Sequence, residues 1–271
     1  MTPAYKRTGT GPLLVCHCGG PGFSGATLGD LGGLVESFEL VILDPRGTGE
    51  TPRPIDGSYR QEDYIADLEE LRAHLGLEQV DLLGHSHGGF VAMSYAAAYP
   101  KRVRRLVLVA TAPRFADEYV ERITKYWTAS DDPSIAAALD ARRSRVAKGD
   151  EEEDEERMKL RMREVRLHFA RADGVEWLGS IFSREPPNTD ALKLFNTEIA
   201  PRYDIRDELG RIEAPTLAIT GGLDFFGPPA NADIVAGIPD AQSVVLENAG
   251  HFVWVDQPDA FREEVRQFLT S

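Results

Sequence analysis

The sequence contains little cysteine and no arrangement of residues typical of a bound metal. Only Cys16 and Cys18 occur among the 271 residues. They lie two apart in an expected strand, where Cα atoms are about 6.5–7 Å apart and poorly placed for a disulfide. His17 lies between them, but no second pair of ligands appears elsewhere, so we interpret the triplet as part of a strand. We therefore expect no metal and no cofactor.

Positive charge is also scarce, and long apolar runs are absent. Thirty basic residues against 44 acidic ones give a net charge of −14, which argues against nucleic acid and anionic membranes as partners. No run of 18 apolar residues occurs, and residues 1–7 lack the apolar core of a signal peptide. We therefore expect a cytoplasmic protein. The composition leaves the oligomeric state open.

Apolar runs alternate with segments of helical pattern along most of the chain. Such continuous apolar strands between helices predict a mostly parallel central sheet that is flanked by helices on both faces, an α/β fold. The length suits one large α/β domain with an insertion, or two small domains. The expected strands are 13–16, 40–43, 80–83, 106–109, 215–220 and 243–246, and the expected helices are 28–36, 62–75, 90–98, 228–238 and a last one whose apolar face is Phe261, Val265, Phe268 and Leu269.

The alternation stops in the middle of the chain. Residues 113–205 are polar and helical in pattern, without a convincing strand, so we expect an inserted helical cap domain there. Residues 1–112 and 206–271 would then form the core domain. The acidic run 150–156 is followed by basic residues, an order that suits a solvated helix start, with pairs Glu153–Arg157 and Glu155–Lys159 four residues apart.

A glycine-flanked serine lies at the centre of the chain. Residues 84–88 are Gly-His-Ser-His-Gly, preceded by the apolar strand 80–83 and followed by the helix 90–98. A strand, a G-x-S-x-G turn and a helix describe a nucleophile elbow, in which a strained backbone lifts the hydroxyl of Ser86 clear of the sheet.

Two further strand ends carry residues suited to nucleophilic catalysis. Functional residues of open parallel sheets gather at the carboxyl ends of strands, where Ser86, Asp224 and His251 all lie. A serine hydroxyl needs an adjacent base, and His251 is the best placed of six histidines. Asp224 would orient this imidazole and stabilise its charged form. The order Ser, Asp, His is that of the α/β-hydrolase triad.

The oxyanion of a tetrahedral intermediate needs two preorganised donors. We expect one to be the backbone N–H of His87, directly after the nucleophile. The other should come from the glycine loop 19–22, most plausibly from Gly20.

With these motifs the chain, from about Leu13 to its C-terminus, resembles proteins of the α/β-hydrolase fold. Within that superfamily it is most similar to the proline iminopeptidase group of serine aminopeptidases. Residues 19–22, Gly-Gly-Pro-Gly, match the group's His-Gly-Gly-Pro-Gly, and residues 44–49, Asp-Pro-Arg-Gly-Thr-Gly, match its Asp-x-Arg-Gly-x-Gly. The resemblance implies a serine hydrolase that forms an acyl-enzyme on small ester or amide substrates and releases N-terminal proline or small residues from peptides.

The sequence departs from the group at three places. Cys18 replaces the leading histidine of the glycine motif, and only twelve residues precede the first clear strand, so the N-terminal strand pair is shortened. Arg166 lies where the group has a carboxylate that binds the substrate's amine. The residues expected to bind substrate are therefore Gly19, Glu164, Glu176 and Glu198.

Other functions share the same residues. A carboxylesterase or lactonase is the main alternative, followed by a carbon–carbon bond hydrolase, because fold and triad do not fix the substrate. A serine nucleophile argues against epoxide and haloalkane hydrolases, which need a carboxylate. A non-catalytic ligand-binding protein of the same fold would have no need of all three triad residues.

Overall fold

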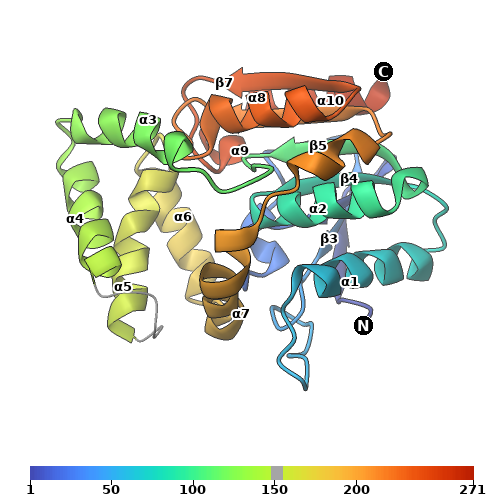
Figure 1. The fold of residues 1–271 in the computed structure, drawn as a ribbon, viewed down its shortest axis with the longest axis horizontal. Helices are drawn as coiled ribbons and strands as arrows, with labels where there is room; N and C mark the ends of the chain where they lie inside the picture. The colour runs from blue at the N-terminus through green and yellow to red at the C-terminus, as the bar shows by residue number, and fades with distance from the viewer. Residues whose placement is uncertain (148–154) are drawn as a thin grey trace.

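The computed structural model describes residues 1–147 and 155–271 and is built on one seven-stranded sheet (Figure 1). The strands lie in the order β1-β3-β2-β4-β5-β6-β7, and all neighbours pair in parallel except β1 with β3. The α/β architecture is that expected from the sequence. The strands are β1 (Tyr5–Thr8), β2 (Leu13–His17), β3 (Glu39–Leu43), β4 (Val80–His85), β5 (Val103–Val109), β6 (Thr216–Gly221) and β7 (Ala241–Leu246).

Two apolar clusters cover the two faces of the sheet. Successive strand residues point to opposite faces, so Val15 belongs to one cluster while Leu14 and Cys16 belong to the other. The first cluster holds apolar residues of α1 (Gln61–His74), α2 (His87–Ala98) and α8 (Gly227–Gly237). The second holds those of α9 (Val253–Asp256) and α10 (Pro258–Thr270), including the four apolar residues of α10 expected from its periodicity.

The helix expected at 28–36 is wrong. The structure has two short 3₁₀ turns instead, η1 (Gly25–Leu28) and η2 (Leu34–Glu36). Gly29, Gly32 and Gly33 lie between them with φ values of 57°, 66° and 85°, a left-handed conformation that no α-helix continues through.

The sequence analysis predicted a shortened N-terminal strand pair but did not identify the edge strand β1. Tyr5–Thr8 runs antiparallel to β3 at the end of the sheet, and most of its side chains are exposed. Its sequence, Tyr-Lys-Arg-Thr, is too polar for an apolar run to indicate a strand. Lys6 and Arg7 on such an edge discourage pairing with another sheet.

The segment between β5 and β6 is helical, as its sequence pattern indicates. Its helices and turns are α3 (Asp117–Thr128), α4 (Pro133–Ala147), α5 (Glu155–Glu164), η4 (Val165–His168), α6 (Asp173–Phe182), α7 (Thr189–Leu194), the π turn η5 (Phe195–Ile199) and the 3₁₀ turns η6 (Ala200–Arg202) and η7 (Arg206–Arg211). Figure 1 shows α3, α4, α5 and α6 gathered at the left of the view, whereas α7 lies lower and nearer the middle. We keep the name cap for residues 113–205, and its exact boundaries stay a prediction. Most of the acidic run, with the two expected charge pairs, lies outside what the structure describes.

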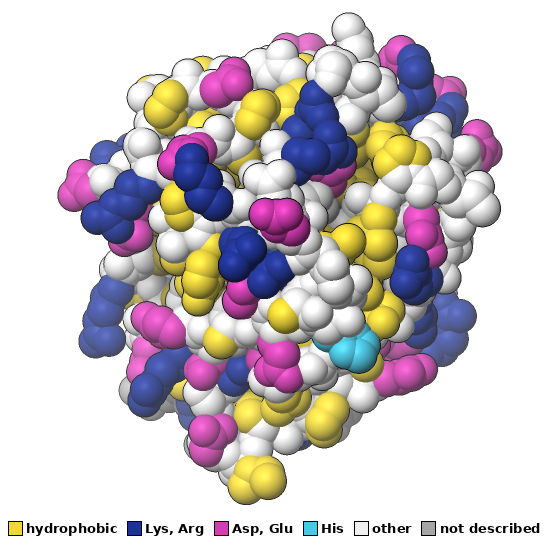
Figure 2. Space-filling model, turned by 90° about the vertical axis from the view of Figure 1, so that its right-hand side faces the viewer, with side chains coloured by type: hydrophobic (Ala, Val, Ile, Leu, Met, Phe, Trp, Pro, Cys, Tyr) yellow, Lys and Arg dark blue, Asp and Glu magenta, His cyan; other side chains and the backbone are white. Residues whose placement is uncertain are grey.

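The outer surface mixes charges of both signs. On the face seen in Figure 2, basic and acidic side chains lie among one another in spite of the net negative charge. Within the described ranges, no helix combines the length and the apolar character needed to cross a membrane.

Candidate active site

Ser86 lies on a sharp turn between β4 and α2. Its φ and ψ are 53° and −117°, a conformation that few residues other than glycine adopt. Its N–H donates to the carbonyl of Val109 (2.9 Å), and its carbonyl accepts from the hydroxyl of Thr111 (2.8 Å). A Cβ on Gly88 would lie 2.3 Å from the carbonyl oxygen of His17, so only glycine fits there. The packing around the turn therefore holds the strain at the serine.

Asp224 and His251 meet at the ends of the two neighbouring strands β6 and β7. Nδ1 of His251 lies 2.9 Å from Oδ1 of Asp224, and both side chains are buried. The hydroxyl of Thr220 donates to the other carboxylate oxygen (3.2 Å). This arrangement keeps Nε2 of His251 available on the opposite side of the ring.

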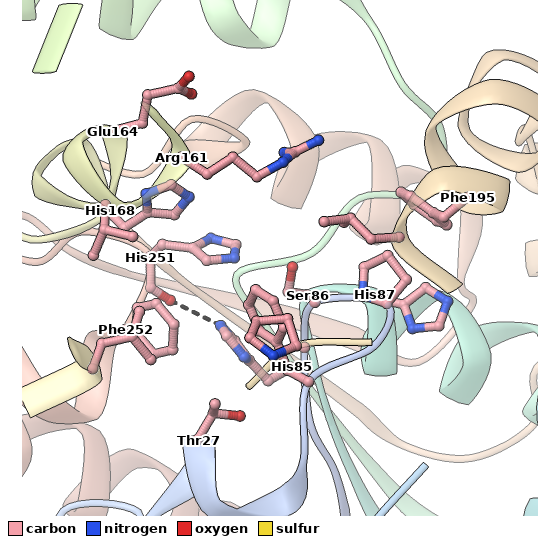
Figure 3. A pocket seen from close by; sticks show the side chains of 18 of the residues that line it. Thr27, His85, Ser86, His87, Arg161, Glu164, His168, Phe195, His251 and Phe252 are labelled. Atoms are coloured by element: carbon pink, nitrogen blue, oxygen red, sulfur yellow. Dashed lines mark hydrogen bonds between the residues drawn. The ribbon is translucent and has the colours of Figure 1, made fainter. Parts of the chain in front are cut away.

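Ser86 and His251 line one pocket, a cavity of about 200 Å³ (Figure 3). Within the described residues no hydrogen bond joins the Ser86 hydroxyl to the His251 ring. Catalytic hydrogen bonds are often long without substrate and tighten when it binds. The rest of the lining is mostly apolar and includes Phe23, Phe115, Phe182, Phe195, Phe225 and Phe252.

The glycine loop passes directly beside the nucleophile. Gly19, Gly20 and His87 all line the pocket. A Cβ on Gly19 would lie 2.7 Å from Cβ of Ser86, and one on Gly20 would lie 2.1 Å from the ring of Phe23. Gly20 also has a φ of 63°. The loop thus depends on glycine where an oxyanion donor is expected.

Of the three acids expected to bind substrate, one reaches the pocket. Glu164 lines it, but Arg145 donates from Nε and Nη2 to its two oxygens at 2.5 and 3.0 Å. Glu176 and Glu198 are exposed, and neither is among the pocket-lining residues. Both side chains therefore face solvent, and the sequence of the cap does not indicate which helix faces do so.

Arg166 is held away from the pocket. Its guanidinium donates to Asp132 (2.8 Å), to the hydroxyl of Ser134 (2.9 Å) and to the carbonyl of Phe169 (2.8 Å). The charge of Arg166 is therefore paired within the cap and does not face the pocket. Arg161 is the cationic side chain that lines the pocket, and sequence reasoning missed it.

Four other histidines lie near this centre, of which His17, His85 and His87 are buried and His168 is half-buried. Burial lowers the pKa of His17 to about 4, and those of His87 and His168 to about 3. It also holds the pKa of His85 well below its ordinary value, and Nε2 of that ring faces the carbonyl of His251 (3.0 Å). Such low pKa values make these imidazoles weak proton acceptors, whereas His251 is bonded to the carboxylate of Asp224 and is therefore the candidate base.

The buried histidines should make the fold sensitive to mild acid. Their unfolded forms take up protons as the pH falls through about 6.5, while the folded forms stay neutral until about pH 4 or lower. Stability is therefore lost between those values, by up to about 1.4 kcal/mol per pH unit for each proton. Urea unfolding measured from pH 7 to pH 4.5 tests this.

Two variants separate this effect from general acid denaturation. We expect His168→Gln to reduce the slope by about one proton. His74→Gln, which replaces an exposed histidine, is the control and should leave the slope unchanged. Equal slopes in the two variants would contradict the assignment.

The buried carboxylate of Asp256, which the sequence analysis did not single out, joins the cap to the histidine loop, residues 247–252 between β7 and α9. Oδ2 of Asp256 accepts the N–H groups of Gly250 (2.8 Å) and Ala170 (2.9 Å), and Oδ1 accepts that of Arg171 (3.2 Å). The N–H of His251 donates to the carbonyl of His168 (2.7 Å). Burial raises the pKa of Asp256, and these backbone donors oppose that rise. The only local signal is an acid that follows the apolar residues 252–255.

Comparison with known proteins gives one family, whose members similar to this chain differ in function. A family model described as alpha/beta hydrolase fold matches residues 11–258. A pimeloyl-[acyl-carrier protein] methyl ester esterase of Aeromonas hydrophila is 30% identical over 274 residues, covering 99% of this chain and all of that protein. The proline iminopeptidase PfmaB of Pestalotiopsis fici is 29% identical over 276 residues, covering 98% of this chain and 95% of its own.

The fold agrees with that family in three dimensions. A crystal structure of a proline iminopeptidase from Mycobacterium smegmatis superposes with a TM-score of 0.77 at 19% identity, covering 98% of this chain and 93% of that one. The identity is low enough that this likeness concerns the fold alone. With the family model matching most of its length, the chain belongs to the alpha/beta hydrolase fold family.

Proposed function

We propose that this hydrolase is a carboxylesterase-type serine hydrolase that acts on small esters with an apolar acyl group. His251 takes the proton of the Ser86 hydroxyl as the oxygen attacks the ester carbonyl, and Asp224 stabilises the resulting imidazolium. The N–H groups of His87 and Gly20 stabilise the oxyanion. His251 then protonates the leaving alcohol, and a water molecule hydrolyses the acyl-enzyme by the same steps.

The observation that carries the proposal is the chemistry of the pocket wall. Aromatic and aliphatic side chains dominate it, which suits an uncharged acyl group. A free ammonium removed from water needs a carboxylate partner. Among the described residues that line the pocket, the only carboxylate is Glu164, and Arg145 already binds both of its oxygens.

An aminopeptidase of the proline iminopeptidase type is the second candidate. The glycine and Asp-x-Arg-Gly-x-Gly motifs favour it, as does the similarity to the Pestalotiopsis fici protein. An ammonium could be bound here if it shared Glu164 with Arg145.

The test compares substrates that differ only in charge. A fluorophosphonate probe should label Ser86, and p-nitrophenyl butyrate should be hydrolysed. Proline p-nitroanilide and its N-acetyl form should then react at similar rates, because the described pocket lining has no unpaired carboxylate to bind the free amine. A loss of at least ~100-fold on acetylation, worth about 2.7 kcal/mol in the transition state, would instead establish an aminopeptidase.

A pair of matched variants locates any amine recognition. If Glu164 binds an ammonium, Glu164→Gln should abolish the preference for the free amine, whereas Glu176→Gln should not, because Glu176 is exposed. Absence of labelling at Ser86 together with absence of ester hydrolysis would overturn the hydrolase proposal itself.

A further inference from the structure

A cap arginine binds the acid loop, residues 222–226 between β6 and α8, which carries the expected triad acid Asp224. Arg122 lies on α3, and its Nη1 donates to the carbonyl of Gly222 while its Nη2 donates to the carbonyl of Asp224, each at 2.8 Å. The loop follows β6 in the core, about 100 residues further along the chain. Arg122 is not among the residues that line the pocket. Its contacts therefore serve the acid loop and not a bound substrate.

The acid loop is shaped around this guanidinium. A Cβ on Gly227 would lie 2.2 Å from Nη2 of Arg122, and Gly227 has a φ of 59°. Nε of Arg122 is buried and has no hydrogen-bond partner among the described residues. Burial lowers the pKa of Arg122, and the negative charges of Asp224 and Glu247 act against that change. An arginine held at such a desolvation cost indicates that its two fixed donors are needed here.

The bonds made by Arg122 hold two backbone carbonyls of the segment that carries the Asp224 carboxylate. The other bonds of this segment come from its own N–H groups, of Gly222 to the carbonyl of Leu246 (2.9 Å), of Leu223 to that of Ala249 (2.9 Å) and of Asp224 to that of Gly221 (3.2 Å). The hydroxyl of Thr220 also donates to the carboxylate of Asp224 (3.2 Å), so Arg122 is the group that binds the carbonyls of this segment. Without Arg122 the carbonyls of Gly222 and Asp224 lose their donors. The carboxylate could then leave the position that brings Oδ1 within 2.9 Å of His251.

We propose that Arg122 is a positioning residue for the triad acid, supplied by the cap to the core. The proposal rests on the triad of the proposed function. It has a specific kinetic consequence: because Arg122 acts through Asp224 and His251, its loss should lower kcat for every substrate, whatever the acyl chain. A residue that only shaped the cap side of the pocket would affect long acyl chains and leave acetates unchanged.

The experiment measures kcat and KM of Arg122→Met and Arg122→Lys with p-nitrophenyl acetate and p-nitrophenyl octanoate. We expect Arg122→Met to lose about 10- to 100-fold in kcat on both esters with little change in KM, in the range of other triad-supporting contacts. Arg122→Lys should recover part of that loss, since an ammonium keeps the charge but not the planar pair of donors. Arg143→Met, which removes an exposed cap arginine bound to Asp140, is the matched control and should behave as wild type.

Three results would overturn the proposal. They are an unchanged kcat in Arg122→Met, a loss confined to the octanoate, and a change in KM alone. If the methionine variant does not fold, as judged by circular dichroism, the lysine variant carries the same comparison.

A second readout separates this proposal from the proposed function. The proton on Nδ1 of His251, bonded to Asp224, gives a far-downfield NMR signal that does not depend on turnover. It should move in Arg122→Met and stay in place in Arg143→Met. An inactive wild type with this pattern would refute the esterase and retain the positioning role, whereas an active wild type with an unmoved signal would refute the positioning role alone.

Discussion

Replacing Ser86 by alanine should lower kcat by at least ~10³-fold and leave the fold intact. The reason is that no other group in the pocket can form the acyl-enzyme from the strained turn between β4 and α2. His251→Ala should have an effect of the same size, and Asp224→Asn a similar or somewhat smaller one. Ester hydrolysis under saturating substrate, with the urea midpoint as a folding check, measures these effects.

The histidine variant is the most informative of the three. If His251→Ala kept wild-type turnover, the base would have to be another histidine and the assignment would be wrong. His74→Ala is the control, because His74 is exposed on α1 and should not affect turnover. The double variant Ser86→Ala, His251→Ala should be no slower than either single variant, since the two residues act as one unit.

Replacing Gly20 by valine should lower kcat by about 10²–10³-fold, the usual cost of losing one oxyanion donor. The added Cβ would lie 2.1 Å from the ring of Phe23, so the glycine loop must move away from Ser86. KM should change much less, because the donor acts mainly on the charge of the transition state. Steady-state kinetics with a p-nitrophenyl ester gives both numbers.

Gly57→Val separates this local effect from backbone strain. Gly57 has a φ of 64°, close to the 63° of Gly20, but a Cβ there meets nothing within 4 Å. Both variants carry the same conformational cost, and only the one at Gly20 should lose kcat. An unchanged kcat with a raised KM in Gly20→Val would move this residue from catalysis to substrate binding.

The parts of the fold that the sequence predicted are those set by local patterns. The parallel strands are continuous apolar runs because both faces of the sheet are covered, and the elbow at Ser86 is marked by its own glycines. The helix at 28–36 failed because its apolar residues have helical spacing while three glycines with positive φ interrupt the chain. The strand β1 carried no apolar run because it lies at the edge of the sheet.

The site shows the same division between local and long-range information. Ser86, Asp224 and His251 were proposed together because each follows an apolar strand, and parallel strands end at one edge of the sheet. Glu176 and Glu198 could not be sorted from Glu164, since which cap side chain faces the pocket depends on how the helices pack. Arg122 and Asp256 act through backbone groups far along the chain, which no spacing rule reveals.

The contacts of Asp256 also limit how substrate enters and product leaves. Residues 168–171 of the cap are bonded to the loop of His251 through Asp256 and through the N–H of His251, so a movement of these residues would also move the proposed base. If they swung outward as a lid, each opening would disturb the proposed triad, so we expect substrate to be exchanged through another part of the pocket rim. Phe115, which is 39% exposed, and residues of α5 line the pocket and make none of these bonds.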